Sequence, residues 1–264
     1  MTAHAPRHIV IRLIGAILIM LLILPIFILV GVSLNAGVEQ TFPPQGLSLR
    51  WYENLANRSG FIEAGRLTLG LAVGSSIVSV LASLCAAVAL ARYTFPGRAF
   101  VLTLLLSPLI VPQVVVGMGF LITLSALGVF NSLFSLSLLH LTITLPFTVR
   151  VVVAALSGMP ASLEQAAQSL GARPLRAFFE ITIPQIGPSL VAAGVFAFVT
   201  SFENFTASQF LVWDRMTLPV AIYTSIQTEN DPTAAALSSL IVVIVVVLIA
   251  IFHRFVIKHM FASS

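Results

Sequence analysis

Two polar features interrupt a chain that is otherwise strongly apolar. The first is an acid, Glu203, in the segment VTSFENFTASQF at residues 199–210, with Asn204 directly after it. A carboxylate inside an apolar segment is costly, and in a membrane helix it marks a solute pathway or an ion pair. Glu203 therefore has two interpretations. Either it attracts a cationic solute, with hydrogen bonds from Asn204, or it is structural, paired with Arg66 or solvated near the outer mouth of a span.

The second feature is the segment LEQAAQSLGARPLRAFFEITIP, which runs from Leu163 to Pro184. Its first half predicts a helix, because Pro160 suits a first turn and Ser162 with Gln165 has the spacing of a capping box. Apolar residues recur on one face of that helix at the i, i+3, i+4 and i+7 positions. They are Leu163, Ala166, Ala167 and Leu170.

Glycine and proline punctuate the same segment. Gly171 is placed to end the first helix in the left-handed conformation. A second short helix begins at Arg173 and Pro174, and Pro184 is expected to end it. The sequence thus predicts a helix–turn–helix over residues 157–184, which either lies flat on the inner leaflet or docks on a cytoplasmic partner. Its basic residues are too few for a DNA-binding pair.

Sequence signatures of catalysis are absent. The chain has no glycine-rich loop ending in lysine and a hydroxyl residue that would hold a nucleotide phosphate. Its single cysteine, Cys85, lies in an apolar run. No cluster of cysteine and histidine has the spacing of a metal site, and no serine, histidine and aspartate set indicates hydrolysis. His140 is a lone histidine in an apolar stretch, which favours a hydrogen-bonded packing role over proton coupling.

The composition assigns the chain to a membrane. Of its 264 residues, 58% are hydrophobic and 8% are charged. A water-soluble domain could not cover so much apolar surface with so few charges. The sequence therefore predicts an all-α polytopic membrane protein that forms a single transmembrane domain over residues 1–264.

Six apolar stretches are long enough to cross a hydrocarbon layer of about 30 Å. They lie near residues 9–34, 67–91, 99–126, 131–156, 185–209 and 233–257. Prolines inside several of them predict kinked helices, because proline lacks the N–H of a helical hydrogen bond. These prolines are Pro25, Pro108, Pro112 and Pro146. The first stretch is too long for the apolar core of a signal peptide, so we expect it to be retained.

The basic residues set the orientation of the spans, because cytoplasmic loops carry an excess of lysine and arginine. With the N-terminus inside, nine of the thirteen lysines and arginines fall on the cytoplasmic side and the other four fall outside. Both termini are then cytoplasmic, and so is the loop over residues 157–184. Membrane topology explains the net positive charge, so no nucleic-acid partner is implied.

Residues 165–184 resemble the cytoplasmic EAA loop of the ABC importer permeases. That pattern reads Glu-Ala-Ala, three residues, Gly, nine residues, and Ile-x-Leu-Pro. The matching positions here are Gln165, Ala166, Ala167, Gly171, Ile181, Ile183 and Pro184. Gln165 replaces the glutamate of the pattern and Ile183 replaces the leucine, whereas Glu164 stands one position early. The six predicted spans around this loop also match the topology of the family.

The resemblance implies the type I importer permease fold, with six transmembrane helices and a cytoplasmic coupling loop. It also implies that the chain is not an enzyme and holds no cofactor, because a separate dimer of ATP-binding subunits holds ATP and magnesium. Two further partners are implied: a second, related permease subunit, which makes the complex heteromeric, and a periplasmic substrate-binding protein. The implied location is the bacterial inner membrane.

Three segments resemble the polyamine branch of these permeases: SFENF, TLPVAIYTSI and DPTAAALSSL, at residues 201–205, 217–226 and 231–240. The resemblance implies spermidine or putrescine as the solute, with Glu203 and Asn204 on its pathway. Relatives of similar sequence carry other solutes, including ferric iron, thiamine, opines and phosphonates. Two other classes stay open: an ion-coupled secondary transporter, which would need a coupling-ion site, and a membrane scaffold without a transport role.

Overall fold

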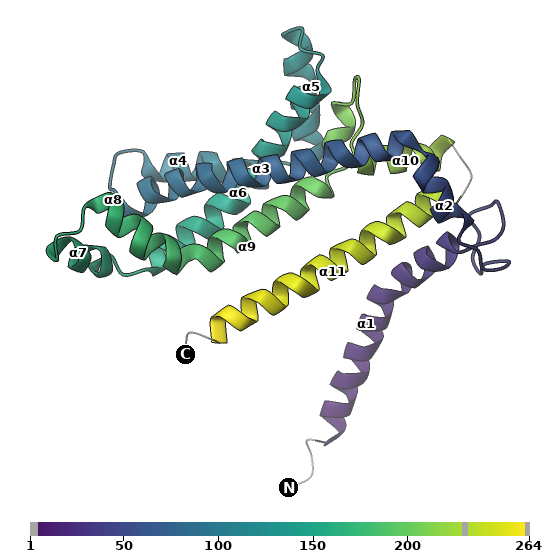
Figure 1. Ribbon diagram of the computed structural model, residues 1–264, viewed down its shortest axis with the longest axis horizontal. Helices are drawn as coiled ribbons and strands as arrows, with labels where there is room; N and C mark the ends of the chain where they lie inside the picture. The colour runs from purple at the N-terminus through teal and green to yellow at the C-terminus, as the bar shows by residue number, and fades with distance from the viewer. Residues whose placement is uncertain (1–4, 229–231, 262–264) are drawn as a thin grey trace. The chain divides into compact units, whose positions relative to one another are not determined.

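The computed structural model describes the backbone of residues 5–228 and 232–261 (Figure 1). Within these ranges the chain is helical and has no strand, only one isolated antiparallel bridge between Asn35 and Leu47. It forms two compact units. The larger unit is Glu63–Val220, and the smaller unit is made of the segments before and after it.

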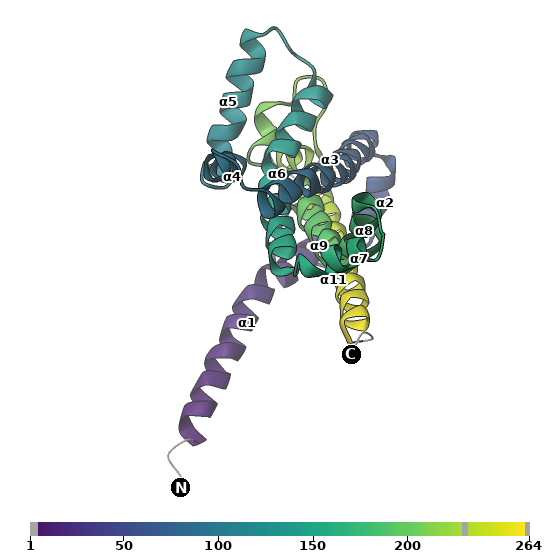
Figure 2. The same cartoon turned by 90° about the vertical axis from the view of Figure 1, so that its left-hand side faces the viewer.

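The larger unit is built on three long helices whose axes run alongside one another (Figures 1 and 2). They are α3 (Ser59–Arg92), α6 (Ser132–Gly158) and α9 (Ile183–Phe202). One cluster of buried apolar side chains between them includes Ala87, Val152 and Ala193. The hydroxyls of Ser79 and Thr144 lie 2.6 Å apart across α3 and α6. Small residues and hydroxyl pairs of this kind let membrane helices pack closely.

Shorter elements follow each of the three long helices, and the first two groups connect one long helix to the next. The first group, after α3, is α4 (Arg98–Leu106), a 3-10 helix (Ser107–Leu109) and α5 (Gln113–Ala126). The second group, before α9, is α7 (Ser162–Ser169), α8 (Pro174–Ala177) and a π-helix (Phe178–Thr182). The third group, after α9, is a 3-10 helix (Ser208–Phe210) and α10 (Leu218–Thr228).

The smaller unit contains α1 (Ala5–Ser33), α2 (Arg50–Asn57) and α11 (Thr233–Phe261), together with α10 from Ala221 onward. Tyr52 joins α1, α2 and α11, because its hydroxyl lies 2.8 Å from Ser33 Oγ on α1 and 2.7 Å from Ser239 Oγ on α11. In the loop between α1 and α2, the Trp51 indole donates a hydrogen bond of 2.7 Å to the carbonyl of Asn35. These contacts hold the ends of the three helices together.

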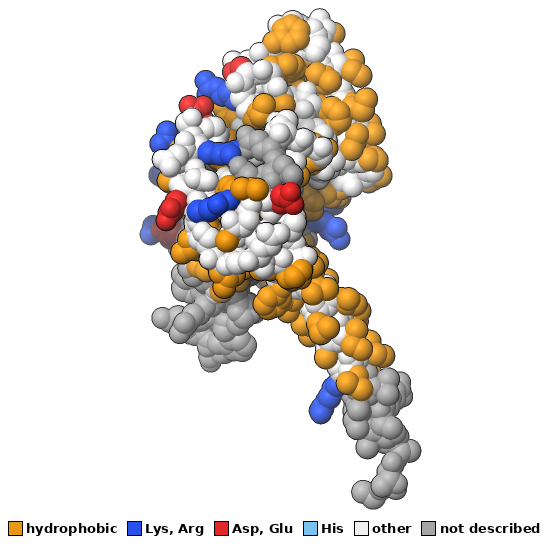
Figure 3. Space-filling view, turned by 90° about the vertical axis from the view of Figure 1, so that its right-hand side faces the viewer, with side chains coloured by type: hydrophobic (Ala, Val, Ile, Leu, Met, Phe, Trp, Pro, Cys, Tyr) orange, Lys and Arg blue, Asp and Glu red, His pale blue; other side chains and the backbone are white. Residues whose placement is uncertain are grey.

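Helix α1 presents an almost wholly apolar surface (Figure 3). From Ile11 to Ser33, only Ser33 at the end of the helix is buried inside the chain. An exposed apolar surface of this size requires lipid or an apolar partner to cover it.

Four helices of the described chain are long and apolar enough to cross a membrane: Ile11–Ser33, Ser59–Arg92, Ser132–Gly158 and Pro174–Phe202. They correspond to the first, second, fourth and fifth predicted spans. The fifth starts earlier than predicted and ends at Phe202 instead of residue 209. The sixth prediction, residues 233–257, falls on α11, a helix of 29 residues whose apolar stretch is described over Thr233–Val247. The side chains of residues 251–257 lie outside those described.

The third predicted span, residues 99–126, is broken. Its two halves, Arg98–Leu109 and Gln113–Ala126, meet at an angle of 99°, so they count as a fifth span only if taken together. The break falls between Pro108 and Pro112, and neither residue has the N–H that would continue the helix. Pro25 and Pro146, by contrast, lie inside continuous helices.

Candidate functional site

The predicted helix–turn–helix over residues 157–184 is present, and its joint is a glycine. Gly171 has φ +92°, the left-handed conformation expected from the sequence. The N–H of Ala172 bonds to the Ala167 carbonyl at 3.0 Å, and the N–H of Gly171 bonds to the Gln168 carbonyl at 3.0 Å. This pair of bonds is the Schellman motif that ends a helix. A Cβ at Gly171 would meet no atom within 4 Å, so its backbone conformation alone makes glycine suitable here.

Two details of the predicted loop are wrong. The capping box does not form, because α7 already begins at Ser162, and the residue before it, Ala161, makes no side-chain cap. Pro184 does not end the second helix either, since the chain is helical from Pro174 to Phe202. Just before Pro184, the Ile183 N–H bonds to the Phe178 carbonyl in a π-turn. This wider turn accommodates the proline ring without ending the helix.

The loop exposes large apolar side chains. The exposed fractions are 91% for Leu170, 74% for Leu175 and 62% for Phe179. Of the residues that match the EAA pattern, Gln165, Ala166, Gly171 and Pro184 are exposed, and Ala167 and Ile181 are partly buried. Exposed apolar residues on a loop between spans indicate a surface that another molecule covers.

Glu164 has a role that its sequence position did not predict. Its Oε1 atom accepts a hydrogen bond of 3.1 Å from Arg92 Nη2 and another from the hydroxyl of Thr182. The sequence pattern placed Glu164 beside the expected glutamate position and gave it no partner. Only the fold shows that it points toward the ends of α3 and the π-helix.

Glu203 lies directly after α9 and not within a span. It is the residue that follows Phe202 at the end of the helix, and its side chain is exposed. No ion pair joins it to Arg66 or to another residue in the described part of the chain. The predicted structural pair with Arg66 is therefore not formed, whereas the exposed side chain fits both an acid solvated by water and a carboxylate on a solute pathway.

Asn204 is buried and holds the backbone beside Glu203. Its Oδ1 accepts hydrogen bonds from the N–H of Ser208 at 3.1 Å and from the Ser208 hydroxyl at 2.8 Å. Its Nδ2 donates to Gln113 Oε1 at 2.9 Å, on the first residue of α5. Asn204 thus fixes the turn after α9 to the start of α5.

His140 continues this chain of hydrogen bonds. Its Nε2 lies 3.1 Å from Ser208 Oγ, and its Nδ1 lies 2.6 Å from Ser201 Oγ. Because the Ser208 hydroxyl donates to Asn204, it accepts from His140 Nε2–H, and Nδ1 then accepts from Ser201. Both ring nitrogens have partners, which agrees with the predicted packing role. The sequence gave no signal for Gln113 or Ser208.

A second set of hydrogen bonds fixes the loop that follows the 3-10 helix. The hydroxyl of Ser132, the first residue of α6, accepts from the N–H groups of Trp213 and Asp214 at 2.8 and 3.1 Å. In return, the N–H of Ser132 donates to Asp214 Oδ1 at 2.9 Å. This backbone hydrogen bond is the largest cause that lowers the pKa of the Asp214 carboxyl, and the Ser132 hydroxyl adds to it.

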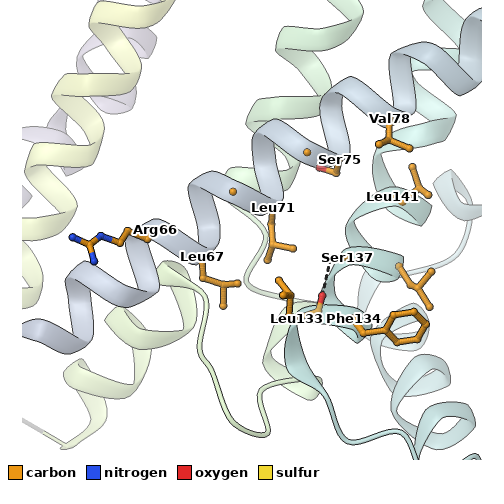
Figure 4. Close-up of a pocket in the computed structure, with 12 residues that line it drawn as sticks. Arg66, Leu67, Leu71, Ser75, Val78, Leu133, Phe134, Ser137 and Leu141 are labelled. Atoms are coloured by element: carbon orange, nitrogen blue, oxygen red, sulfur yellow. Dashed lines mark hydrogen bonds between the residues drawn. The ribbon is translucent and has the colours of Figure 1, made fainter.

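A groove lies between α3 and α6 (Figure 4). Its walls are mostly apolar, with Leu67, Leu71 and Phe134 among the lining residues, and its volume is about 470 Å³. Arg66 lies at one end, and its guanidinium points away from the other labelled side chains (Figure 4). This lining suits hydrocarbon or an apolar helix better than a polar solute. Among the described residues, no group of three histidine, cysteine or acidic side chains could hold a metal ion.

A family model described as "Binding-protein-dependent transport system inner membrane component" matches residues 79–261. The chain belongs to this family. It is therefore an inner-membrane permease component of an ABC transporter and not an enzyme. The loop with Gly171 and the turn with Glu203 both lie within the matched residues.

Similar proteins support this assignment. The permease is 30% identical over 224 residues to the spermidine/putrescine transport system permease protein PotC of Escherichia coli K12, covering 83% of each chain. It is 29% identical over 246 residues to the putrescine transport system permease protein PotI of the same strain, covering 90% of this chain and 86% of PotI. The molybdenum transport system permease protein ModB of that strain is 36% identical, over 56% of this chain and 72% of ModB.

A solved structure shows the same fold. It is the crystal structure of a bacterial ABC transporter involved in the import of the acidic polysaccharide alginate. One of its chains matches this permease with a TM-score of 0.74 at 14% identity, covering 97% of this chain and 98% of that one. The fold class predicted from the sequence, an importer permease made of helices, is confirmed.

Proposed function

We propose that this permease subunit carries a polyamine, spermidine or putrescine, or a similar small organic cation across the inner membrane. The observation that carries the proposal is the exposed carboxylate of Glu203, which has no ion-pair partner among the described residues and lies at the end of α9 away from the coupling loop. Protonated amines are attracted to such a carboxylate, and the attraction is strongest where lipid or protein excludes water. Asn204 supports this role by holding the turn that carries Glu203.

The names of the similar proteins favour a cation but do not decide the solute alone. PotC and PotI are named for polyamines, whereas ModB is named for molybdenum and the solved relative for an acidic polysaccharide. An unpaired carboxylate on the pathway repels an anionic solute and attracts a cationic one. The charge of Glu203 therefore favours the polyamine relatives as the guide to the cargo.

We further propose that the helix–turn–helix docks on a dimer of ATP-binding subunits that holds ATP and magnesium. Its contact residues are Gln165, Ala166, Ala167, Gly171, Ile181 and Pro184, together with the exposed apolar side chains of the same loop. A second permease subunit covers the apolar surface of α1, and a periplasmic binding protein delivers the solute. Both termini are cytoplasmic in this arrangement.

The cargo is tested by neutralising the acid. In the complex purified with its native partners and placed in liposomes, Glu203→Gln should lower uptake of labelled putrescine at limiting concentration about ten- to a hundredfold, since a hydrogen bond to a charged group contributes about 1.5–3 kcal/mol. Glu53→Gln, which neutralises an exposed acid on α2, is the matched control and should leave uptake unchanged. Competition by spermidine, ferric iron, thiamine, an opine and a phosphonate shows which class shares the site. Equal uptake by both variants over a range of concentrations would remove Glu203 from the pathway.

The docking surface is tested at its most exposed side chain. Leu170→Ser should reduce co-purification of the ATP-binding subunits without changing membrane insertion, because Leu170 is 91% exposed and its side chain supports little of the fold. Leu47→Ser, at a leucine that is 77% exposed in the loop after α1, is the control and should retain them. Retention of the ATP-binding subunits by Leu170→Ser and by combined Leu170→Ser/Leu175→Ser would contradict docking at this loop.

A further inference from the structure

Glu164 connects the coupling helix to two other elements. Within the described chain, both side-chain hydrogen bonds that join α7 to other elements end on Glu164 Oε1. One comes from Arg92, the last residue of α3, and the other from Thr182, the last residue of the π-helix that leads into α9. A single carboxylate oxygen therefore joins α7 to the ends of two long helices.

This junction is shielded from water. The side chains of Arg92 and Glu164 are 17% and 20% exposed, and Thr182 is fully buried. Arg92 Nε is buried and has no hydrogen-bond partner among the described residues, so Glu164 supplies the contact that orients the guanidinium. Removing one partner of such a pair leaves the other charge poorly compensated, which is strongly unfavourable.

A second ion pair on the same loop differs in each of these respects. Arg176 Nε lies 2.9 Å from Glu180 Oε1, but the two side chains are 69% and 61% exposed. They are four residues apart in one helical stretch, so their pair connects no separate elements. Exposed pairs of this kind contribute little to stability, and this one provides a control for the charge of the loop.

We propose that Glu164 is a positioning residue of the transport cycle, which fixes α7 to α3 and to the start of α9 so that a displacement of α7 moves both helices. The inference rests on the proposed docking of this loop on an ATP-binding subunit. Without the carboxylate, α7 keeps its exposed docking side chains. When α7 is displaced, it then slides past α3 and α9, and the displacement is not passed on to these two helices.

The test uses the intact importer in liposomes, with its ATP-binding subunits and its binding protein, and measures putrescine transported per ATP hydrolysed. Glu164→Ala and Arg92→Ala should retain the ATP-binding subunits yet lower this ratio on the order of tenfold, the size of effect that coupled neighbouring residues show. The swapped pair Arg92→Glu/Glu164→Arg should recover most of the ratio. Thr182→Val, which keeps the shape and removes the hydroxyl, should cause a smaller loss. Glu180→Ala should leave the ratio unchanged.

Three results would overturn the inference. The first is an unchanged ratio in Glu164→Ala, which leaves the docking proposal intact. The second is loss of the ATP-binding subunits from Glu164→Ala with no recovery in the swapped pair, because Glu164 would then be a docking contact. The third is a failure of the unmodified chain to retain these subunits, which co-purification detects and which refutes the proposed function as well. If Glu164→Ala does not accumulate in the membrane, the ratio of putrescine transported to ATP hydrolysed is measured in Thr182→Val and in the swapped pair instead.

Discussion

A single buried amide, Asn35, organises the loop between α1 and α2. Its Nδ2 donates to the Glu39 carbonyl at 3.0 Å and to Thr41 Oγ1 at 3.2 Å. Its Oδ1 accepts from the N–H groups of Gly37 and Gln45 at 3.1 and 2.9 Å. Both donors and both acceptor sites of the amide are used, so no other residue type reproduces this set of bonds.

We therefore expect Asn35→Ala to destabilise this loop by about 2–4 kcal/mol, because several buried polar groups lose their partners at once. Trp51 lies against the same residue, so its fluorescence during thermal unfolding measures the change. Gln45→Ala is the control, because Gln45 bonds to Asn35 through its backbone N–H and not through its side chain. Similar unfolding midpoints for the two variants would refute the assignment of Asn35 as the organising residue.

Asp214 gives a pH dependence whose sign can be stated. The pKa of its carboxyl is lowered in the fold from the ordinary value of 3.8, chiefly by the hydrogen bond from the Ser132 N–H. Ionised Asp214 therefore stabilises the folded chain above pH 3.8, and this stabilisation is lost as the pH falls through the lowered pKa.

The matching experiment compares the wild-type chain with Asp214→Asn between pH 7 and pH 3. The variant should unfold at a lower temperature than the wild-type chain at pH 7. The difference between the two unfolding temperatures should disappear as the pH falls below 3.8. A difference in unfolding temperature that stays constant over this pH range would mean that the charge of Asp214 does not contribute to the stability of the fold.

Single residues differed in how well the sequence predicted them. Gly171 was predicted correctly, because its φ is dictated by local helix ending. Glu164 and Gln113 were missed, because their partners, Arg92 and Asn204, lie 72 and 91 residues away. Side-chain contacts over such separations follow from the fold and leave no local pattern.

At the scale of elements, one close contact fixes α5 against the 3-10 helix Ser208–Phe210. A Cβ at Gly117 would lie 2.7 Å from the Ala207 carbonyl oxygen and 2.8 Å from Phe210 Cδ2. The backbone oxygen cannot move aside as a flexible side chain could, so glycine is required at this position.

Gly117→Ala should accordingly destabilise the packing of α5 by about 1–3 kcal/mol, the usual effect of overpacking. Gly119→Ala lies two residues away in the same helix, where a Cβ would meet nothing within 4 Å. This control should be neutral or slightly stabilising, since alanine favours a helix over glycine. Thermal unfolding of the two purified variants measures the difference, and equal losses would show that the contact is relaxed at no cost.

Element boundaries show what periodicity can predict. The first and fourth spans were predicted within four residues of their helices, because composition separates them from the loops, whereas the helix of the second span begins eight residues earlier than predicted, at Ser59. The break in the third span was predicted only as a kink, since Pro108 and Pro112 indicate a missing hydrogen bond but not an angle of 99°. The start of the fifth helix at Pro174 was missed, because Pro184 was predicted to end the short helix before it and a π-turn has no sequence signature of its own.

At the scale of the whole molecule, the charge distribution predicts the orientation in the membrane. In a Cys85→Ser background, Val38→Cys lies in the loop after α1 at a position that is 66% exposed, and Ser162→Cys lies at the start of α7. A membrane-impermeant maleimide should label Val38→Cys in spheroplasts and Ser162→Cys only after the membrane is opened, because arginine and lysine keep the coupling loop inside.

Labelling of both positions in opened membranes is the control for thiol reactivity. Labelling of Ser162→Cys in sealed spheroplasts would place the loop on the wrong side for docking, and the proposed partners would fail with it. Composition and charge were enough to predict a polytopic membrane protein. Both properties reflect the bilayer that surrounds the whole chain, and neither depends on a single contact.

The π-turn at Phe178–Thr182 changes the direction in which side chains point along the helical stretch from Pro174 to Phe202. Each residue of an α-helix rotates the chain by about 100°, so one extra residue in a turn offsets everything before it from everything after it by that angle. Leu175 therefore points in a direction around the helix axis that the α-helical repeat of α9 would not give it. Deleting one residue in the π-turn would make the α-helix continuous. The apolar side chains of α8 would then be rotated by about 100° around the helix axis relative to α9.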